Sequence, residues 1–369
     1  MLKAAVERAS LYEAAQVVAR AVSGRSTLPV LNNLFVEGTE GSLRLVATDL
    51  ELGIEAAASA RVEEEGALTV PARIFAEVMA NLPEAEVELE VDEGNTVSVR
   101  CERSSYNIRG LPAEEFSTLP ELVSPIVFEL PQTTLRQVIG QTTFASSPDE
   151  TRPILTGVLL SVGADEMRVV ATDTHRLALR QLPGIQGIKE SRSVIVPARV
   201  LNELSRVLRE GSEDPVEVRL TDTQIQFLVD RISLQSRLIE GQFPNYEKVV
   251  PDTFERLITV SAEAFQQALR RALIVAREDA NRVVLSAKQG LLTITADSQD
   301  VGRGQEDVEV ALEGDPLEIA FNARYLLDVL AVIDAENAEI QLTGALNPGT
   351  IRRQGDSSYT YVLMPMQIM

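Results

Sequence analysis

The sequence feature that most constrains the fold is a repeat that occurs three times along the chain. The segment Val-Ala-Thr-Asp at residues 46–49 returns at residues 170–173, and the related Ile-Thr-Ala-Asp follows at residues 294–297. A second marker repeats with a similar interval, at residues 70–73, 196–199 and 321–324. Units of this length exceed solenoid repeats and are large enough to bury their own cores, so we expect three whole domains.

Stretches rich in proline and acidic residues separate the copies. They lie at residues 111–125 and 241–252. A third marker, Ser-Ser-Tyr, precedes the first stretch and recurs near the end of the sequence. We therefore predict domains at residues 1–123, 124–251 and 252–369.

Each copy has the pattern of an α+β domain. A short strand leads into a helix with apolar residues at spacings of three and four. Hairpins follow at residues 34–48, 157–171 and 282–295, and a second helix is expected at residues 72–82, 197–209 and 322–333. Two helices and many short strands per copy predict antiparallel sheets covered by helices on one side. The expected helix N-caps are Ser10, Thr133 or Thr134, and Ser261, and the expected turn glycines are Gly41, Gly163 and Gly290.

The composition argues against several classes of function. Cys101 is the only cysteine and His175 the only histidine among 369 residues, so an internal disulfide is impossible and a usual zinc site is not expected. Phosphate-binding glycine loops are absent, and no nucleophile with a base can be nominated, so we expect no enzyme, no cofactor and no metal. The absence of a leader pattern and of a run of about 18 apolar residues predicts a cytoplasmic protein with no membrane partner.

The net charge of −21 argues against a nucleic-acid partner until its placement is considered. The six expected helices hold ten arginines against five acidic residues, a net charge of +5, so the other residues carry −26. Arginines on repeated helices suit phosphate contact without base reading, and the negative remainder would repel DNA elsewhere. Solvated helix faces with a chance distribution of charge are the alternative explanation.

Several segments together resemble the bacterial DNA sliding clamp family, the beta subunit of DNA polymerase III. They lie in order along the full chain, at residues 28–34, 46–52, 69–73, 170–179, 194–199, 241–246, 321–330 and 361–369. The resemblance implies two chains closed head to tail into a ring, with sheets outside, helices inside, and duplex DNA in the hole. It also implies a non-catalytic role and partners that include the clamp loader, the DNA polymerase III alpha subunit, other DNA polymerases, and mismatch repair and ligase proteins.

Helix packing supports the homodimer. Twelve helices spaced about 8 to 10 Å apart leave a hole of roughly 28 Å, which accommodates a duplex about 20 Å wide. Six helices from one chain leave only roughly 9 Å. One chain cannot encircle a duplex, whereas two can. The arginines expected to face the DNA are Arg20, Arg25, Arg73, Arg136, Arg199 and Arg206.

The resemblance also implies a partner-peptide pocket and a dimer interface. Methionine and leucine would supply adaptable apolar walls, while His175 and Arg176 would hold polar groups, although Met364 and Met366 as core residues remain an alternative. The implied pocket residues are Leu155, Thr172, His175, Arg176, Leu177, Pro244, Val249, Asn322, Tyr325, Val362, Met364, Pro365 and Met366. The implied interface residues are Arg103, Tyr106, Ile108, Leu273, Ile274, Asp300 and Glu306. Arg103 and Arg109 are expected to pair with one or more of Asp297, Asp300, Glu306 and Asp307.

Three further expectations concern single residues and the competing function. His175 is expected in a strand, and Asp49, Asp173 and Asp297 are expected to be turn residues because they are isolated in their domains. The alternative to a clamp is a triplicated acidic scaffold that binds proteins but does not encircle DNA. Arginines on all the repeat helices favour the clamp.

Overall fold

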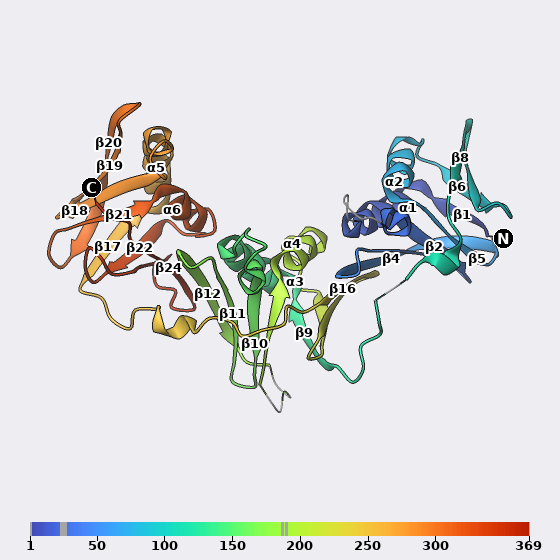
Figure 1. The fold of residues 1–369 in the computed structure, drawn as a ribbon, viewed down its shortest axis with the longest axis horizontal. Helices are drawn as coiled ribbons and strands as arrows, with labels where there is room; N and C mark the ends of the chain where they lie inside the picture. Colours follow the sequence, from blue (N-terminus) through green and yellow to red (C-terminus); the bar gives the residue numbers. More distant parts are fainter. Residues whose placement is uncertain (1, 23–27, 118, 186–187, 189–190, 369) are drawn as a thin grey trace. The chain divides into compact units, whose positions relative to one another are not determined.

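The repeat seen in the sequence is a repeat of element order. The computed structural model describes residues 2–22, 28–117, 119–185, 188 and 191–368. Within them, each copy has the order strand, helix, four strands, helix and three strands. The predicted α+β class with three similar domains is therefore confirmed, and Figure 1 shows the helices and strands of all three copies.

The element bounds of the three copies are as follows. The first copy comprises β1 (Lys3–Glu7), α1 (Arg8–Val18), β2 (Asn33–Thr39), β3 (Ser42–Thr48), β4 (Leu52–Glu64), β5 (Gly66–Pro71), α2 (Ala72–Asn81), β6 (Glu86–Val91), β7 (Thr96–Cys101) and β8 (Ser104–Arg109). The second comprises β9 (Ile126–Pro131), α3 (Gln132–Thr142), β10 (Gly157–Val162), β11 (Glu166–Thr172), β12 (Arg176–Pro183), β13 (Arg192–Pro197), α4 (Ala198–Val207), β14 (Pro215–Leu220), β15 (Gln224–Val229) and β16 (Ile232–Arg237). The third comprises β17 (Arg256–Ser261), α5 (Ala262–Ala276), β18 (Arg282–Lys288), β19 (Leu291–Ser298), β20 (Gly302–Glu313), β21 (Leu317–Asn322), α6 (Ala323–Leu330), β22 (Asn337–Leu342), β23 (Gly349–Arg353) and β24 (Tyr359–Leu363).

The strands form two antiparallel sheets, one in each of two compact units. The first unit comprises residues 1–136 and 199–238, and the second comprises residues 137–198 and 239–369. The first sheet runs β8-β7-β6-β1-β4-β16-β15-β14-β9, with β3, β2 and β5 branching from β4. The second runs β13-β10-β11-β12-β24-β23-β22-β17-β20-β19-β18-β21. The middle copy thus contributes strands to both sheets.

Two strand pairings join neighbouring copies. We call the pairing of β4 with β16 the first seam and the pairing of β12 with β24 the second seam. In the first seam Gly53 lies opposite Gln235, and in the second Leu177 lies opposite Val362. The repeat therefore places the same backbone pairing at both seams and gives it different side chains.

Helices cover one face of the sheet in each unit (Figure 1). Helix α1 packs against α2 and against β4, and it buries Leu11, Ala14, Ala15 and Val18 at the predicted helical spacing. Helix α5 packs against α6 and against β19 and β20. The apolar periodicity therefore predicted the buried faces of these helices correctly.

The helix starts were predicted less well than the helices. Helix α1 begins at Arg8 directly after β1, so Ser10 lies inside the first turn and is not the N-cap. Helix α3 begins at Gln132, and the hydroxyl of Thr133 donates to Glu213 across 2.7 Å. Only Ser261 caps as expected, because its hydroxyl accepts from the backbone N–H of Ala264 at 3.4 Å. Strands that run straight into helices leave no room for a separate capping loop.

Two of the three repeated aspartates occupy turns. Asp49 accepts from the backbone N–H groups of Glu51 and Leu52, and Asp173 does the same for His175 and Arg176. Asp297 lies within β19 instead, paired with Arg303, so its assignment to a turn was wrong. The β19–β20 hairpin is longer than its counterparts, which moves the turn beyond Ser298.

Other local predictions were corrected at turns and helix ends. His175 lies in the turn after β11 and not in a strand, where Thr174 adopts a positive φ of 81°. Gly41 and Gly290 have the left-handed backbone that favours glycine, with φ of 77° and 79°. Gly163 does not have a positive φ. The second helices end one to three residues earlier than predicted, at Asn81, Val207 and Leu330.

Candidate functional site

Arg176 is the centre of a polar network at the second seam. Its Nε donates to Asp173 at 3.0 Å, its Nη2 donates to the carbonyl of Phe144 at 2.6 Å, and its Nη1 donates to Asp328. The guanidinium carbon lies 4.3 Å from the ring centroid of Tyr325, within cation–π range. Arg176 therefore links β12 of the middle copy to α6 of the third copy.

The charge on Arg176 is held in place by its surroundings. Only 10% of its side chain is exposed, and only 8% of the Asp173 side chain. Burial alone would lower the pKa of Arg176, but Tyr361, Asp328 and Asp173 outweigh burial and raise that pKa. A buried guanidinium with these partners is a fixed structural charge and is not free to titrate near neutral pH.

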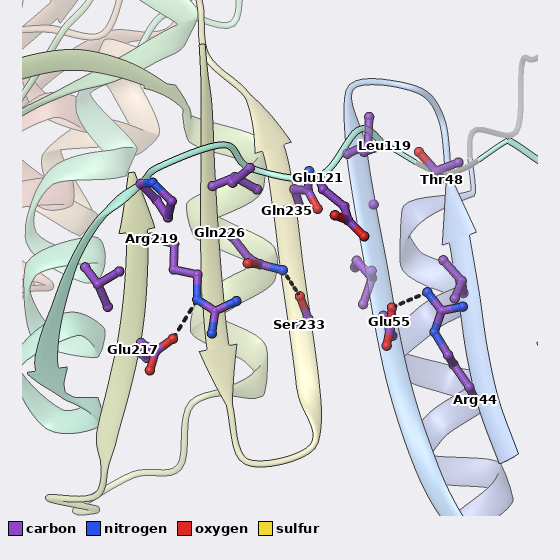
Figure 2. A pocket seen from close by; sticks show the side chains of 16 residues that line it. Arg44, Thr48, Glu55, Leu119, Glu121, Glu217, Arg219, Gln226, Ser233 and Gln235 are labelled. Carbon is purple, nitrogen blue, oxygen red and sulfur yellow. Dashed lines mark hydrogen bonds and ion pairs between the residues drawn. The ribbon is translucent and has the colours of Figure 1, made fainter. Parts of the chain in front are cut away.

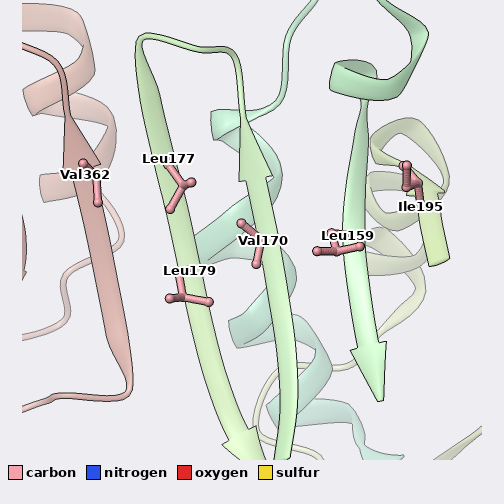
Figure 3. Packing of buried hydrophobic residues seen from close by; sticks show 6 residues of the cluster. All are labelled: Leu159, Val170, Leu177, Leu179, Ile195 and Val362. Carbon is pink, nitrogen blue, oxygen red and sulfur yellow. The ribbon is translucent and has the colours of Figure 1, made fainter. Parts of the chain in front are cut away.

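An apolar cluster covers the sheet face next to this network. Leu177 and Leu179 on β12, Val170 on β11 and Val362 on β24 project from one face of the sheet (Figure 3). The cluster is completed by Leu159 and Ile195, and Ile154, Ile239, Phe243, Tyr246, Val249 and Val250 pack against it. Leu177 and Val362 are 4% and 1% exposed, so the apolar floor of the expected peptide pocket is already covered by the chain's own residues.

The other expected pocket residues divide into exposed and structural side chains. His175 and Pro244 are exposed, whereas Met364, Pro365 and Met366 are half-buried and therefore do not fill a core. The backbone N–H of Met364 donates to the carbonyl of His175 at 2.9 Å. Leu155 and Thr172 are buried, and Asn322 caps α6 by accepting from the N–H of Arg324.

Three of the six expected DNA-facing arginines have partners within the described part of the protein. Arg199 pairs with Asp49 at 2.5 Å, and Arg206 pairs with Glu203 at 2.6 Å. Arg136 donates to two carbonyls at the end of α4, those of Ser205 and Leu208. Arg73 is exposed and has no ion pair with the described residues, Arg20 is half-buried, and Arg25 lies outside the described residues.

The expected interface residues also differ in exposure. Tyr106 on β8 and Ile274 on α5 are 45% and 64% exposed, whereas Ile108 and Leu273 are buried within their own domains. Ile108 pairs in register with the buried Val97, and Leu273 continues the buried stripe of α5. Arg103 and Asp300 are exposed.

Glu306 is engaged inside the chain. It accepts from Arg271 at 2.6 Å, and that hydrogen bond is the main reason that its pKa is lowered. Asp307 accepts from the hydroxyl of Thr293, and Asp297 pairs in register with Arg303. Of the acidic residues expected to meet Arg103 and Arg109, Asp297 and Asp300 are thus the two whose side chains make no hydrogen bond or ion pair with the described residues.

Sequence reasoning missed Asp328 as a partner of Arg176. The two residues are 152 positions apart, and no local pattern joins them. A signal was present in the repeat, because Glu77, Glu203 and Asp328 occupy the same place in the second helix of each copy. This repeated acidic position is the signal that could have marked Asp328 as a candidate partner for an arginine.

The described part of the chain carries neither a metal-binding cluster nor a membrane-spanning helix. There, no group of three or more His, Cys, Asp or Glu side chains is placed to hold a metal ion. No described helix is long and apolar enough to cross a membrane. Cys101 is buried, and burial raises the pKa of its thiol, which disfavours the reactive thiolate.

Comparison with known proteins identifies the family. Residues 2–120, 129–245 and 247–367 match the N-terminal, central and C-terminal domains of the DNA polymerase III beta subunit. The Escherichia coli K12 beta sliding clamp is 36% identical over 369 residues, covering 100% of both chains, and the Bacillus subtilis clamp is 33% identical, covering 99% and 100%.

Solved structures agree with the sequence matches. The crystal structure of the Bacillus subtilis DNA polymerase sliding clamp superposes with a TM-score of 0.95 at 32% identity, covering 100% of both chains. The Pseudomonas aeruginosa sliding clamp bound to griselimycin superposes with a TM-score of 0.94 at 32% identity, again covering 100% of both chains. The chain belongs to the DNA polymerase III beta-subunit family of sliding clamps, which are non-catalytic processivity factors.

Proposed function

We propose that this protein closes as a homodimeric ring around duplex DNA, without sequence preference, and thereby keeps a replicative DNA polymerase on its template. The observation that carries the proposal is the threefold domain with two helices per copy. The domains are proposed at residues 1–123, 124–251 and 252–369. An arginine-bearing helix layer in a chain of net charge −21 would accept DNA on one face and repel it from the others.

Ring closure is proposed through two strands with a free edge. Strand β8 ends the first sheet, and residues 302–309 of β20 pair only with β19. A free edge offers unpaired backbone N–H and C=O groups to a second chain. Tyr106 and Ile274 would add exposed apolar surface to this contact, and Arg103 would face Asp300.

Partner proteins are proposed to dock at the second seam. The clamp loader, the DNA polymerase III alpha subunit, other DNA polymerases, and mismatch repair and ligase proteins are the expected partners in the cytoplasm. A peptide with a glutamine and a downstream Leu-Phe pair would place its apolar side chains against Leu177, Pro244 and Met364. Because Leu177 is buried, the peptide must displace part of the covering segment at residues 239–250.

The peptide site is tested with exposed residues, since a change at Leu177 would also disturb the core. The double substitution His175→Ala with Met364→Ala should weaken binding of such a peptide by about tenfold or more, while the dimer mass stays unchanged. Lys288→Ala, an exposed change on β18, is the control for surface substitutions. Unchanged affinity in the double variant would place the site elsewhere.

The ring is tested by topology. Loaded by an ATP-driven clamp loader onto nicked circular DNA, the protein should remain bound through gel filtration in salt that removes electrostatic binders. Cutting the circle once should release it, because a ring slides off a free end. Equal retention on circular and linear DNA would refute encirclement.

The competing proposal, an acidic scaffold that binds only proteins, predicts a different result in the same experiment. With a loader proven active on its own clamp, a scaffold would load onto neither circular nor linear DNA. Light scattering gives an independent answer, because the mass of a single chain at micromolar concentration would rule out the two-chain ring.

A further inference from the structure

A polar pocket of about 690 Å³ lies on the sheet at the first seam. Its floor is formed by β3 and β4 of the first copy and by β14, β15 and β16 of the middle copy (Figure 2). One rim is formed by the segment that connects the two copies, through Leu119, Glu121, Leu122 and Pro125. The cavity lies within the size range of small-molecule and peptide side-chain sites.

The charged groups in this pocket are nearly all paired. Arg44 donates to Glu55 at 2.8 Å, and Arg219 donates to Glu217 at 2.6 Å (Figure 2). The hydrogen bond to Glu55 is the main reason that the pKa of Arg44 is raised. Glu121 is exposed, and its carboxylate makes no hydrogen bond or ion pair with the described residues.

Neutral hydrogen-bonding groups lie between the charged pairs. The amide of Gln226 donates to the hydroxyl of Ser233 at 2.9 Å, and the amide of Gln235 donates to the carbonyl of Pro120 at 2.6 Å. The amide nitrogen of Gln235 also donates to Gln224 at 3.2 Å, so both of its donors are used, whereas Gln226 keeps one spare donor and both side chains keep an acceptor oxygen. The pocket can therefore bind the backbone of an extended peptide as well as one charged side chain.

The repeat relates this pocket to the apolar cluster at the second seam. Gly53, Glu55 and Gln235 occupy the register positions that Leu177, Leu179 and Val362 occupy there. Leu119 of the connecting segment packs closely over Gly53, because a Cβ at this position would lie only 3.2 Å from Leu119 Cδ1. The first seam is thus polar where the second seam is filled with aliphatic side chains.

We propose that the first-seam pocket is a second docking site, which takes a basic segment of a partner protein and binds a lysine or arginine side chain at Glu121. Three carboxylates face two guanidiniums around the cavity, and each guanidinium is already held by a carboxylate, so a phosphate or a nucleic acid finds no free cation. A cationic side chain pairs with the free carboxylate, and the protein's negative charge steers it toward the site. This docking site and its ligand do not depend on whether the protein encircles DNA.

The test uses a fluorescein-labelled peptide in which lysines alternate with glycine and serine, and it measures anisotropy on the full-length protein at low salt. Binding should be saturable, and Glu121→Gln should weaken it by about three- to fivefold. The matched control is Glu114→Gln, an exposed glutamate in the same connecting segment that does not line the pocket. It removes the same charge and should leave the affinity unchanged.

A charge reversal completes the experiment. Glu121→Lys should abolish the preference for the lysine peptide and allow an otherwise identical glutamate peptide to bind. Far-UV circular dichroism and dimer mass serve as folding controls, because Glu121 is exposed. The proposal is overturned if both glutamine variants weaken binding equally, if the acidic peptide binds the unmodified protein as well, or if no saturation appears up to about 1 mM peptide.

Discussion

The first and second seams share a backbone arrangement and differ in almost everything that fills it. Each consists of five residue pairs between two antiparallel strands. At the first seam an ion pair between the half-exposed Arg199 and the shielded carboxylate of Asp49 accompanies a polar pocket. At the second, the buried Arg176 network accompanies a closed aliphatic cluster. Backbone hydrogen bonds thus determine how neighbouring copies pair, while the side chains at each seam determine its stability and the ligands it can bind.

Removing the central cation should show the largest difference between the seams. Arg176→Met keeps much of the side-chain volume but leaves Asp173 buried without its partner, which should cost about 3 to 5 kcal/mol of unfolding free energy. At the first seam Arg199→Met should cost about 1 kcal/mol, because the Arg199 side chain is half-exposed and water can replace it beside Asp49. Urea denaturation followed by circular dichroism measures both.

The contrast between these two variants would fail if they shifted the urea midpoint equally. Asp49 and Asp173 each keep two backbone N–H donors after the loss of the arginine, so a large effect at Asp49 would mean that the first seam depends on its ion pair more than the exposure of Arg199 indicates.

Shortening the facing side chains is expected to give the next largest contrast. Leu177→Ala removes a buried aliphatic group and should cost about 2 to 5 kcal/mol, depending on how far the cluster collapses. The first-seam equivalent of Leu177 is Gly53, which has no side chain to shorten, so the comparison is made at the residue opposite it. Gln235→Ala truncates a side chain at the polar pocket and should cost no more than about 1.5 kcal/mol. Thermal denaturation of both variants with the wild type provides the measurement, and equal losses would contradict the distinction between a packed and a polar seam.

The domain number, the helix faces and the helix–hairpin succession could be predicted from the sequence because they depend on local patterns. The repeat interval predicts three domains, and spacings of three and four predict the buried face of α1. Strand β4 was missed as a long strand, although its residues alternate between buried and less buried positions from Leu52 to Ser59. The first seam is formed by β4, and the second is formed by its counterpart β12.

The parts of the candidate site that sequence reasoning missed depend on distant contacts. Arg176 was singled out through the family resemblance, but Asp328 and Phe144 approach it only after folding. The Asp49–Arg199 pair spans 150 positions and occupies an arginine that had been expected to face DNA. The residue types showed that Arg176 and Arg199 carry positive charge, but only the structure shows which residues they pair with.

A smaller effect is expected from releasing Arg199. Asp49→Asn keeps a side-chain oxygen for the turn and removes the charge that engages the guanidinium. If the helices face DNA as proposed, the freed arginine can contact a phosphate, and the slope of log affinity against log salt for linear duplex should steepen by up to about 0.9. Fluorescence anisotropy at several KCl concentrations measures it.

The control for this prediction is Glu51→Gln, which removes an equal charge two residues away from Asp49. The side chain of Glu51 makes no hydrogen bond or ion pair with the described residues. Both variants reduce the general repulsion of DNA, but only Asp49→Asn frees a cation. Identical salt slopes in the two variants would show that Arg199 does not reach the phosphates.

The smallest expected effect is a pH dependence confined to the second seam. Arg180 there pairs with Asp356 at 2.9 Å, whereas the equivalent first-seam residue is Ala56. Burial alone would raise the pKa of Asp356, but hydrogen bonds from Ser358 and Arg180 outweigh it and lower that pKa.

A lowered folded-state pKa means that the ionised carboxylate stabilises the fold above the unfolded pKa of about 3.9, and that this stability disappears as pH falls through the folded value. Asp356→Asn should therefore be less stable than the wild type at pH 7 and pH 5 by a similar amount, and the difference in urea midpoint should shrink steadily below about pH 4. A difference that stayed constant down to about pH 2 would mean that the asparagine disturbs packing and that the charge of Asp356 contributes nothing to the second seam.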